Sequence, residues 1–434
     1  MNKKRISIFI AVFFVLILIG IIGRYKVSKE PVILNLGIFS GSNWDIPNWQ
    51  SYRIFDEAIA DFERIHPNIK VKYRSGTLKS DYSEWLAQKI VKGEEPDVFA
   101  VLSSDFNTFA SIGILKKLDN LISNDEEFKI DNMYNNALKS GQLSGAQYAI
   151  SSEVSPTLMF VNKTILESEG ISVPTDSWDW ESFYNICKKI TKDTDEDGII
   201  DQFGTSGFTW KHAVYTNGQQ LFDQNGTKAW FNNPEVVEAV KFTRDLNKLN
   251  INSKPAEFDS GKVAFEPFTF SEYRAYKFYP YKVNMNNFDW ECIKLPKGPN
   301  GRNASELMNF SMGISSRTKH TAEAWEFLKF IATNETTQLN VLNYSYGVPV
   351  LRNLVGSDQA RKVLSEYSIS NEKLIDTQKL CQVIEESIVT PRFQKYEKAM
   401  DMADKVIFQI INNDGDVENA LSKLNRELNI FLKK

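Results

Sequence analysis

The stretch "IKVKYRSGTLKSDYSEWLAQKIVKGEEPDVFAVL", Ile69–Leu102, decides the fold class. Residues 69–76 alternate between apolar and polar, which predicts a strand, and residues 98–102 form a short apolar run typical of a buried strand. Residues 80–97 predict a helix between them, with Ser80 as its N-cap. A strand, a helix and a second strand in this order predict parallel strands whose connecting helix covers the sheet.

The flanking segments continue this pattern. Residues 32–39, "VILNLGIF", alternate and predict a first strand, and residues 51–68 predict an amphipathic helix before the second strand. Further along, residues 148–163 predict two strands joined by a bend at Pro156, and residues 396–432 are mostly helical in pattern. We therefore expect an α/β fold.

Composition narrows the class of protein. The chain has 434 residues, enough for two or more domains, and 42% hydrophobic with 24% charged residues is ordinary for a soluble globular protein. The net charge of −4 gives no reason to expect nucleic acid as a partner.

The N-terminus predicts export. Lys3, Lys4 and Arg5 precede an apolar run from Ile6 to Gly23 that is just long enough to span a bilayer. Neither an A-x-A-like cleavage site nor a lipoprotein cysteine follows the run. We expect residues 1–30 to be an uncleaved signal anchor and linker, which would tether an extracytoplasmic protein to the outer face of the cell membrane. The alternative is a signal peptide cleaved at an atypical site near residues 20–23.

An acidic loop suggests a metal. "KDTDEDGIIDQFG", Lys192–Gly204, has the spacing of the first part of an EF-hand loop. The expected ligands are the carboxylates of Asp193, Asp195, Asp197 and Asp201 and the carbonyl of Ile199. Position 12 is Gly204 in place of glutamate, and no exiting helix follows directly, so the loop is not an EF-hand sensor. Two readings remain open: one structural calcium ion, or a metal-free acidic turn.

Catalytic motifs are missing from the sequence. It contains no phosphate-binding loop, GxSxG elbow, HExxH or GxGxxG pattern. Asp179 and Glu181 could suggest a glycosidase pair, but they stand at the predicted start of a helix, where acids complement the helix dipole. We therefore expect a binding protein and not an enzyme.

The order of several segments resembles a known family, the carbohydrate-binding extracellular solute-binding protein family 1 of ABC importers, which is maltose-binding-protein-like. The segments that carry the resemblance include "FERIHPNIKVKY", "GEEPDVFAV", "YAISSEVSPTLMFVNKTILESEGISVP", "WDWESFYNICKKITKDTDEDGIIDQFG" and "FDSGKVAFE". The chain departs from the family by lacking a lipobox cysteine, by Asn217 in place of the first glycine of a pair, and by Phe265 in place of a small residue.

The resemblance implies a two-lobed periplasmic-binding-protein-like fold (type II), with each lobe a sheet flanked by helices and a ligand cleft between the lobes. Residues 31–152 and 315–346 would form lobe 1, and residues 153–314 and 347–434 lobe 2. The implied function is capture of a carbohydrate, an oligosaccharide in particular, by a monomer that delivers it to ABC transporter permease subunits. A membrane-anchored sugar-sensing ectodomain and, less favoured, a glycan-degrading enzyme are the alternatives.

Aromatic residues near predicted turns suit a sugar, because ring faces stack on pyranoses while polar groups bind hydroxyls. Loops after strands and the implied crossings supply the candidate ligand-binding residues: Ser40, Trp44, Asp105, Glu153, Trp210, Glu266, Phe268, Asn309 and Tyr346. For each of them the alternative is ordinary surface or core packing. We expect Trp44 and Trp210 to offer stacking faces outside the core.

Overall fold

The computed structural model describes residues 30–434 except 45, 47, 74–75, 251–252, 254–255, 277–287, 367–375 and 414. The predicted anchor at residues 1–29 lies outside the described residues. Among the described residues, no helix is both long enough and apolar enough to span a bilayer.

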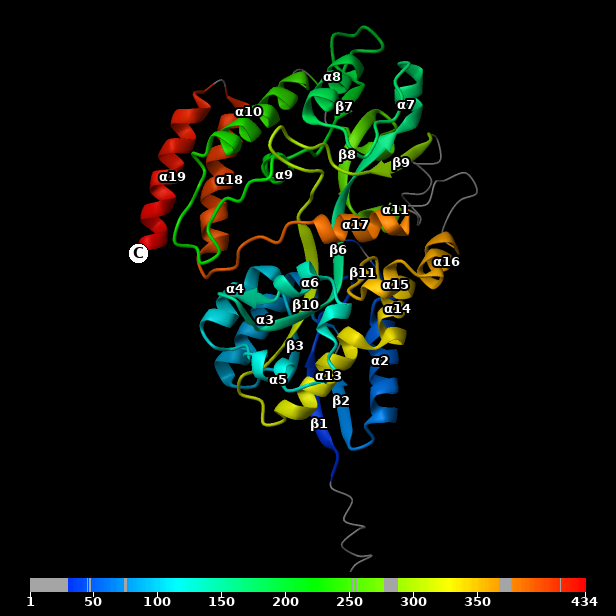
Figure 1. Cartoon of the computed structure of the whole chain (residues 1–434), viewed down its shortest axis with the longest axis vertical. Helices are drawn as coiled ribbons and strands as arrows, with labels where there is room; N and C mark the ends of the chain where they lie inside the picture. The colour runs from blue at the N-terminus through cyan, green and yellow to red at the C-terminus, as the bar shows by residue number, and fades with distance from the viewer. Residues whose placement is uncertain are drawn as a thin grey trace, which may run out of the picture.

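The elements follow one another as a mixture of strands and helices (Figure 1). The strands are β1 (Val32–Gly37), β2 (Ile69–Tyr73), β3 (Val98–Val101), β4 (Gln142–Leu143), β5 (Ala146–Gln147), β6 (Ala149–Asn162), β7 (Phe203–Thr205), β8 (Val263–Thr269), β9 (Trp290–Ile293), β10 (Leu307–Ile314) and β11 (Val348–Pro349). The α-helices up to residue 249 are α2 (Tyr52–Ile65), α3 (Lys79–Lys92), α4 (Ser103–Ser111), α5 (Asp119–Ser123), α6 (Asn135–Lys139), α7 (Lys163–Ser168), α8 (Trp180–Ile190), α9 (Trp210–Thr216) and α10 (Pro234–Leu249). The later ones are α11 (Phe270–Tyr276), α13 (Thr321–Thr333), α14 (Glu335–Tyr344), α15 (Arg352–Val355), α16 (Asp358–Glu366), α17 (Thr377–Glu386), α18 (Tyr396–Asn412) and α19 (Val417–Lys433). The part of the chain that the structure describes also has two short 3₁₀ helices, η1 (Ile130–Asn132) and η2 (Phe258–Ser260).

The predicted strand–helix–strand unit is confirmed. β1 pairs in parallel with β2 and with β3, and α2 and α3 make the connections. Ser80 is not the N-cap of α3: the helix begins at Lys79 after Leu78, and Ser80 Oγ donates to Asp81 Oδ1 at 3.0 Å. A side chain already inside the first turn cannot take the capping geometry, which needs an extended backbone before the helix.

One long strand joins the two halves of the sheet. The strand order is β2-β1-β3-β10-β6-β8-β7, and β9 and β11 also pair with β6. β6 runs unbroken for 14 buried residues, so the predicted bend at Pro156 is wrong. Pro156 lies opposite Leu307, the first residue of β10, and the next amide, Thr157 N, donates to Ser305 Oγ at 3.1 Å, which satisfies the backbone just beyond the end of this ladder.

Successive side chains of β6 pack alternately in two hydrophobic cores. Leu158 and Phe160 belong to the first core, whereas Met159 and Val161 belong to the second. The first core also contains most of the apolar side chains of residues 34–154 and 307–384, and the second contains those of α8, α9, α10, α18 and α19. Because successive side chains of a strand point to opposite faces, a single strand serves both cores.

The chain runs from α17 to α18 across the middle of the molecule (Figure 1). Buried apolar residues from Val348 to Ile384 belong to the first core, and those from Phe393 to Leu432 belong to the second. The lobe limits stay a prediction.

Candidate functional site

The carboxylate of Glu153 lies where three segments of the chain meet. Glu153 is 1% exposed and sits on β6 where β10 and β11 flank it. Its Oε1 accepts a hydrogen bond from Asn43 Nδ2 at 2.6 Å. Its Oε2 accepts from Trp44 Nε1 at 3.1 Å and from Ser345 Oγ at 2.5 Å. The loop after β1, the middle of β6 and the loop after α14 are therefore joined through one side chain.

Burial raises the pKa of Glu153 to about 7, although the hydrogen bonds from Ser345, Trp44 and Asn43 and the positive charge of Arg274 act to lower it. Arg274 is 3% exposed, and its Nη2 donates to Leu342 O at 2.8 Å. The Glu153 carboxyl group therefore gains or loses its proton near neutral pH.

Gly347 and Tyr346 complete this cluster. A Cβ at Gly347 would lie 2.6 Å from Glu153 Oε2 and 2.9 Å from the Trp44 ring, so a side chain there would force the cluster apart. Tyr346 is half-buried against the first core; burial raises the pKa of its hydroxyl, and the charge of Arg274 lowers it. The structure thus brings together the predicted residues Trp44 and Glu153, and Tyr346 lies between Ser345 and Gly347 of the same cluster in the sequence.

Three of the predicted aromatic residues are core residues. Trp44 is 3% exposed, Trp210 6% and Phe268 9%. The expectation that the two tryptophans offer faces outside the core is wrong, because each ring is buried while its indole N–H finds an acceptor: Trp210 Nε1 donates to Asp404 Oδ1 at 3.0 Å. Phe268 packs edge-on against Phe160, with ring centroids 4.8 Å apart.

Trp49, on the same loop as Trp44, is 85% exposed. It is the aromatic of this loop that presents a free face. The neighbouring Asn48 Nδ2 donates to Tyr344 O at 2.9 Å, which fixes the loop beside the residues that precede Ser345.

Ser40 and Asp105 follow β1 and β3, as predicted. Ser40 Oγ donates to Thr77 O at 3.0 Å, so its hydroxyl ties two loops of the first half together. Asp105, in α4, accepts from Ser83 Oγ at 2.8 Å, and burial raises the pKa of its carboxyl. Its Oδ2 is buried without a hydrogen-bond donor among the described residues.

Glu266 and Asn309 each form a hydrogen bond with a residue close to them in the sequence. Glu266, on β8, accepts from Phe258 N at 2.9 Å, and burial raises its pKa to about 7, with the charges of Glu257 and Glu272 adding to the rise. Asn309, on β10, donates from Nδ2 to Ser311 Oγ at 2.5 Å.

The acidic loop brings three of its five predicted ligands together. Carboxylate oxygens of Asp193, Asp195 and Asp197 lie within 4.8 Å of one another. Asp201 instead accepts from Thr194 Oγ1 at 2.7 Å and from Lys262 Nζ at 3.3 Å. Ile199 donates its amide to Asp197 Oδ1 at 2.8 Å, and no described contact of its carbonyl joins the cluster. Three carboxylates and turn carbonyls are the donors that calcium takes in proteins.

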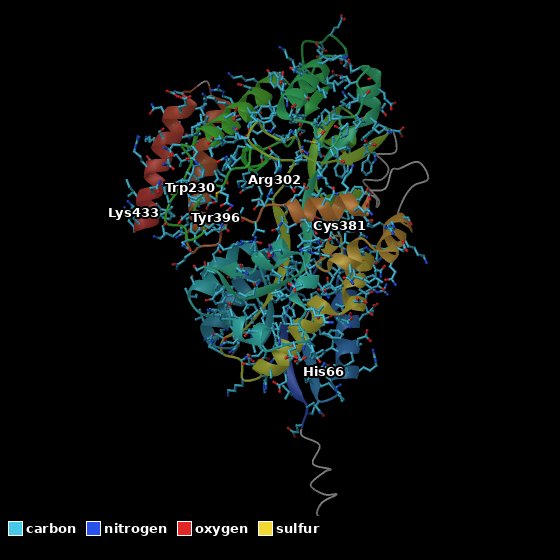
Figure 2. All side chains as sticks on the ribbon, in the orientation of Figure 1. His66, Trp230, Arg302, Cys381, Tyr396 and Lys433 are labelled. Atoms are coloured by element: carbon cyan, nitrogen blue, oxygen red, sulfur yellow. The ribbon has the colours of Figure 1, made fainter. Side chains whose placement is uncertain are left out.

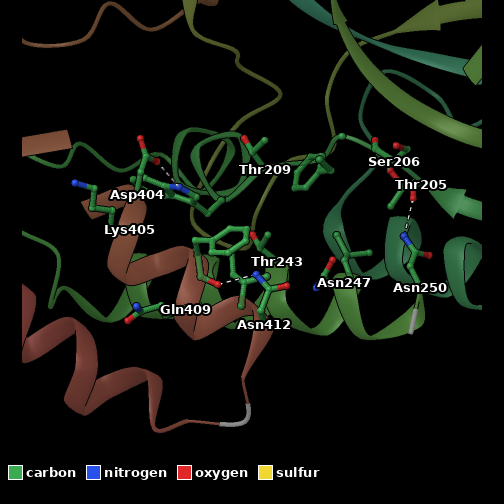
Figure 3. A pocket seen from close by; sticks show the side chains of 16 residues that line it. Thr205, Ser206, Thr209, Thr243, Asn247, Asn250, Asp404, Lys405, Gln409 and Asn412 are labelled. Carbon is green, nitrogen blue, oxygen red and sulfur yellow. Dashed lines mark hydrogen bonds between the residues drawn. The ribbon is translucent and has the colours of Figure 1, made fainter. Parts of the chain in front are cut away.

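Two of the hollows in the described part of the chain, a larger and a smaller one, bear on where a ligand could bind. One, of about 750 Å³, lies on the second core between α10, α18 and the loop before α9; Trp210, Asn250, Asp404 and Phe408 are among its lining residues (Figure 3). The other, of about 430 Å³, is lined from both sides of the α17–α18 connection.

This second hollow takes residues from elements that the sequence assigned to different lobes. Lys139 and Gln142 come from α6 and β4 of the first half, Gln220 and Arg302 from the second, and Ser387–Arg392 from the connection itself. Figure 2 labels Arg302, which lines this hollow, and Tyr396, and both lie near the middle of the long axis.

The connection also makes a direct contact across the two halves. The guanidinium carbon of Arg392 lies 5.6 Å from the ring centroid of Phe106 in α4. On its other side Arg392 is near the acidic Glu306 and Glu397, whose charges raise the pKa that burial of the guanidinium lowers. Burial raises the pKa of Glu306, and the charge of Arg392 opposes that rise.

A family model described as bacterial extracellular solute-binding protein matches residues 47–338. The chain belongs to this family. Its members are binding proteins of the extracytoplasmic space, as their family description states.

Similar proteins share the fold at low sequence identity. A cyclic alpha-maltosyl-1,6-maltose binding protein from Arthrobacter globiformis superposes with a TM-score of 0.75 at 17% identity, covering 93% of this chain and 99% of that one. An ABC substrate-binding protein from Listeria monocytogenes in complex with cycloalternan gives 0.71 at 19% identity, covering 93% and 100%. The predicted α/β, two-lobed binding-protein fold is confirmed by this structural similarity.

Curated relatives match over part of their length. An uncharacterized lipoprotein of Streptomyces antibioticus is 23% identical over 65% of this chain and 64% of its own length. An arabinooligosaccharide-binding protein of Bacillus subtilis is 24% identical over 45% of this chain and 44% of its own. The chain thus spans less than two thirds of each of these relatives.

Sequence reasoning missed several residues of the Glu153 cluster. Asn43, Ser345 and Gly347 hold Glu153, and they neighbour Trp44 and Tyr346 in the sequence, so inspection of residues flanking the singled-out aromatics would have found them. The sequence offered no such signal for Arg274, nor for the basic residues of the smaller hollow, because they come from separate helices and loops.

Proposed function

We propose that this chain captures an oligosaccharide between its two halves and delivers it to the permease of an ABC importer. The observation that carries the proposal is the polar hollow of about 430 Å³, to which both halves and the α17–α18 connection contribute. A ligand that contacts both halves binds their closed arrangement better than an open one, and this differential affinity drives closure.

Carbohydrate is the favoured ligand class for two reasons. The lining of the hollow is rich in side-chain amides, which can both donate to and accept from hydroxyl groups. The solved structures and curated relatives reported above include binding proteins named for maltose-type and arabinose oligosaccharides.

A thermal-shift screen of oligosaccharides tests the proposal. A bound ligand at about 100 times its dissociation constant should raise the free energy of unfolding by roughly 2.7 kcal/mol. Calorimetric titration of each hit then gives the affinity. Stabilisation by peptides alone would overturn the carbohydrate assignment, and turnover of a chromogenic glycoside would favour an enzyme. A permease pair encoded beside this chain separates import from sensing.

We also propose that the segment at residues 1–30 tethers the protein to the outer face of the cell membrane and that the protein acts as a monomer. The support for the tether is the sequence: basic residues precede the apolar run, and no cleavage motif follows it. N-terminal sequencing of the exported protein decides the point, since a mature chain beginning after Gly23 would contradict retention. Light scattering of the exported protein measures its oligomeric state.

A further inference from the structure

The hollow between the two halves has an unbalanced charge. Its charged lining residues are Lys139, Arg302 and Arg392, and none of the residues that line it carries a carboxylate. The remaining side chains with polar groups are amides and hydroxyls, including Gln142, Gln220 and others. A site with this lining would favour a ligand that is both negatively charged and rich in hydroxyl groups.

The three cations are not neutralised by nearby salt bridges. Within the described part of the chain, no ion pair involves any of them, and the acids just before the connection are engaged elsewhere. Glu385 faces Arg352 at 3.8 Å, and Glu386 accepts from Lys294 at 2.9 Å.

Arg392 adds a second observation. Its Nε is buried and has no hydrogen-bond acceptor among the described residues. Glu306 and Glu397 lie near enough to act on its charge, so Arg392 is partly compensated, whereas Lys139 and Arg302 are exposed and form no ion pair with any described residue. An incoming anion would therefore meet Arg302 and Lys139 first.

We infer that the ligand of this hollow is an acidic saccharide, a sugar chain carrying carboxylate or sulfate groups. The inference rests on the proposed function and names its substrate class. Arg302, from the second half, and Lys139, from the first, bind the anionic groups, while the amides of Gln142, Gln220 and Gln224 bind hydroxyls. A guanidinium presents two parallel N–H donors to a carboxylate or sulfate, and a lysine contributes a point charge. Because the two cations stand on opposite sides, one acidic chain joins both halves.

Titration calorimetry on the full chain tests the inference with probes that differ in charge. The probes are tetragalacturonate, its fully methyl-esterified form, a sulfated chondroitin tetrasaccharide and inorganic sulfate. We expect an acidic saccharide to bind at least tenfold more tightly than the neutral ester, and its affinity to fall as salt rises. The carboxylate and sulfate arms show which anion the site takes.

Two variants and one control test whether Arg302 and Lys139 cause the preference for an acidic saccharide. Arg302→Gln and Lys139→Gln should each weaken binding of the acidic saccharide about tenfold, with little change for the ester. Lys405→Gln is the control, because Lys405 is an exposed lysine that lines the other hollow. Far-UV circular dichroism confirms that the variants fold.

The outcomes separate this inference from the proposed function. If the ester and the acid bind equally well and neither Arg302→Gln nor Lys139→Gln changes the affinity, the ligand is not an acidic saccharide. The proposed capture of an oligosaccharide is not affected by that result. If none of the four probes binds while neutral sugars do in the screen, the acidic class also falls. Binding of inorganic sulfate as tight as any saccharide means an adventitious ion only and overturns the inference. If no saccharide binds in either experiment, the proposed function itself fails.

Discussion

Glu153 makes the stability of the protein depend on pH. Its pKa is about 7 in the folded protein and near the ordinary 4.5 when the chain unfolds. The folded state therefore holds the proton more tightly, so the stabilisation is full below about pH 4.5 and is lost as pH rises to about 7. A shift of this size corresponds to ~3 kcal/mol. We expect the free energy of unfolding in urea to fall by about this amount across the window.

Glu153→Gln should remove this contribution. The amide oxygen can still accept from Trp44 and Ser345, and Asn43 can turn its own amide to match, but the proton equilibrium is gone. Glu266→Gln is a matched comparison, since burial raises the pKa of Glu266 to about 7 as well. Each variant should flatten part of the pH dependence measured by urea unfolding between pH 4.5 and 8. A Glu153→Gln protein with the wild-type pH profile would show that another group titrates.

Two tryptophans on one loop should differ in what they contribute. Trp44 is 3% exposed and Trp49 is 85% exposed. Trp44→Ala removes a buried ring and one of the two hydrogen bonds to Glu153 Oε2, so we expect it to lower the free energy of unfolding by about 3–5 kcal/mol. Trp49→Ala, the control, should change it by less than about 0.5 kcal/mol. Chemical denaturation of both variants measures the difference, and similar losses in the two would contradict the burial of Trp44.

At the scale of elements, the acidic loop between α8 and β7 joins a helix to the edge of the sheet. We propose that a calcium ion bound by Asp193, Asp195 and Asp197 stabilises this junction. Calcium at about 100 times its dissociation constant should add roughly 2.7 kcal/mol, and a chelator should lower the melting temperature. Saturable saccharide binding should persist with chelator at a temperature where the chain stays folded.

Asp195→Asn and Asp201→Asn test whether calcium binds to the cluster of Asp193, Asp195 and Asp197 or also needs Asp201. Asp195→Asn should abolish the response of the melting temperature to calcium. Asp201→Asn should keep it, because Asp201 pairs with Thr194 and Lys262. Superimposable melting curves of the wild-type protein in calcium and in chelator would leave the loop a metal-free turn.

The elements that the sequence predicted well are those with a clear period. β1, β2 and α2 were recoverable because alternation or helical spacing reports which face is buried. β6 was not recoverable as one strand, because all 14 of its residues are buried, polar ones such as Ser151 and Glu153 included, so its sequence shows no regular alternation on either side of Pro156. For the same reason, the sequence pattern does not show that β6 packs against both cores.

The candidate site was predictable in part. Glu153 and Trp44 were chosen from their place at a crossing and after a strand, and the structure joins them by a hydrogen bond. Trp210 was chosen on the same ground yet is buried against the second core. Position along the chain shows that an aromatic residue follows a strand, but the direction of its ring depends on packing partners hundreds of residues away, such as Asp404.

At the scale of the whole molecule, β6 couples the two cores. Its pairings to β10 and β11 lie in the first half, and its pairings to β8 and β9 lie in the second. The first core continues along one face of this second part through Phe258, Phe268 and Trp290. Loss of either core therefore strips ladder partners and buried area from the strand that the other core needs.

We therefore expect both cores to unfold in a single transition. Phe62→Ala and Phe231→Ala each remove a ring that is fully buried, the first in one core and the second in the other. Each should lower the free energy of unfolding by about 3–5 kcal/mol and shift the whole melting curve. The measurements are calorimetry together with far-UV circular dichroism and tryptophan fluorescence, which should give coincident transitions. If Phe62→Ala moved one transition and left a second in place, the cores would be independent, and the closing of one half on the other would need no shared strand.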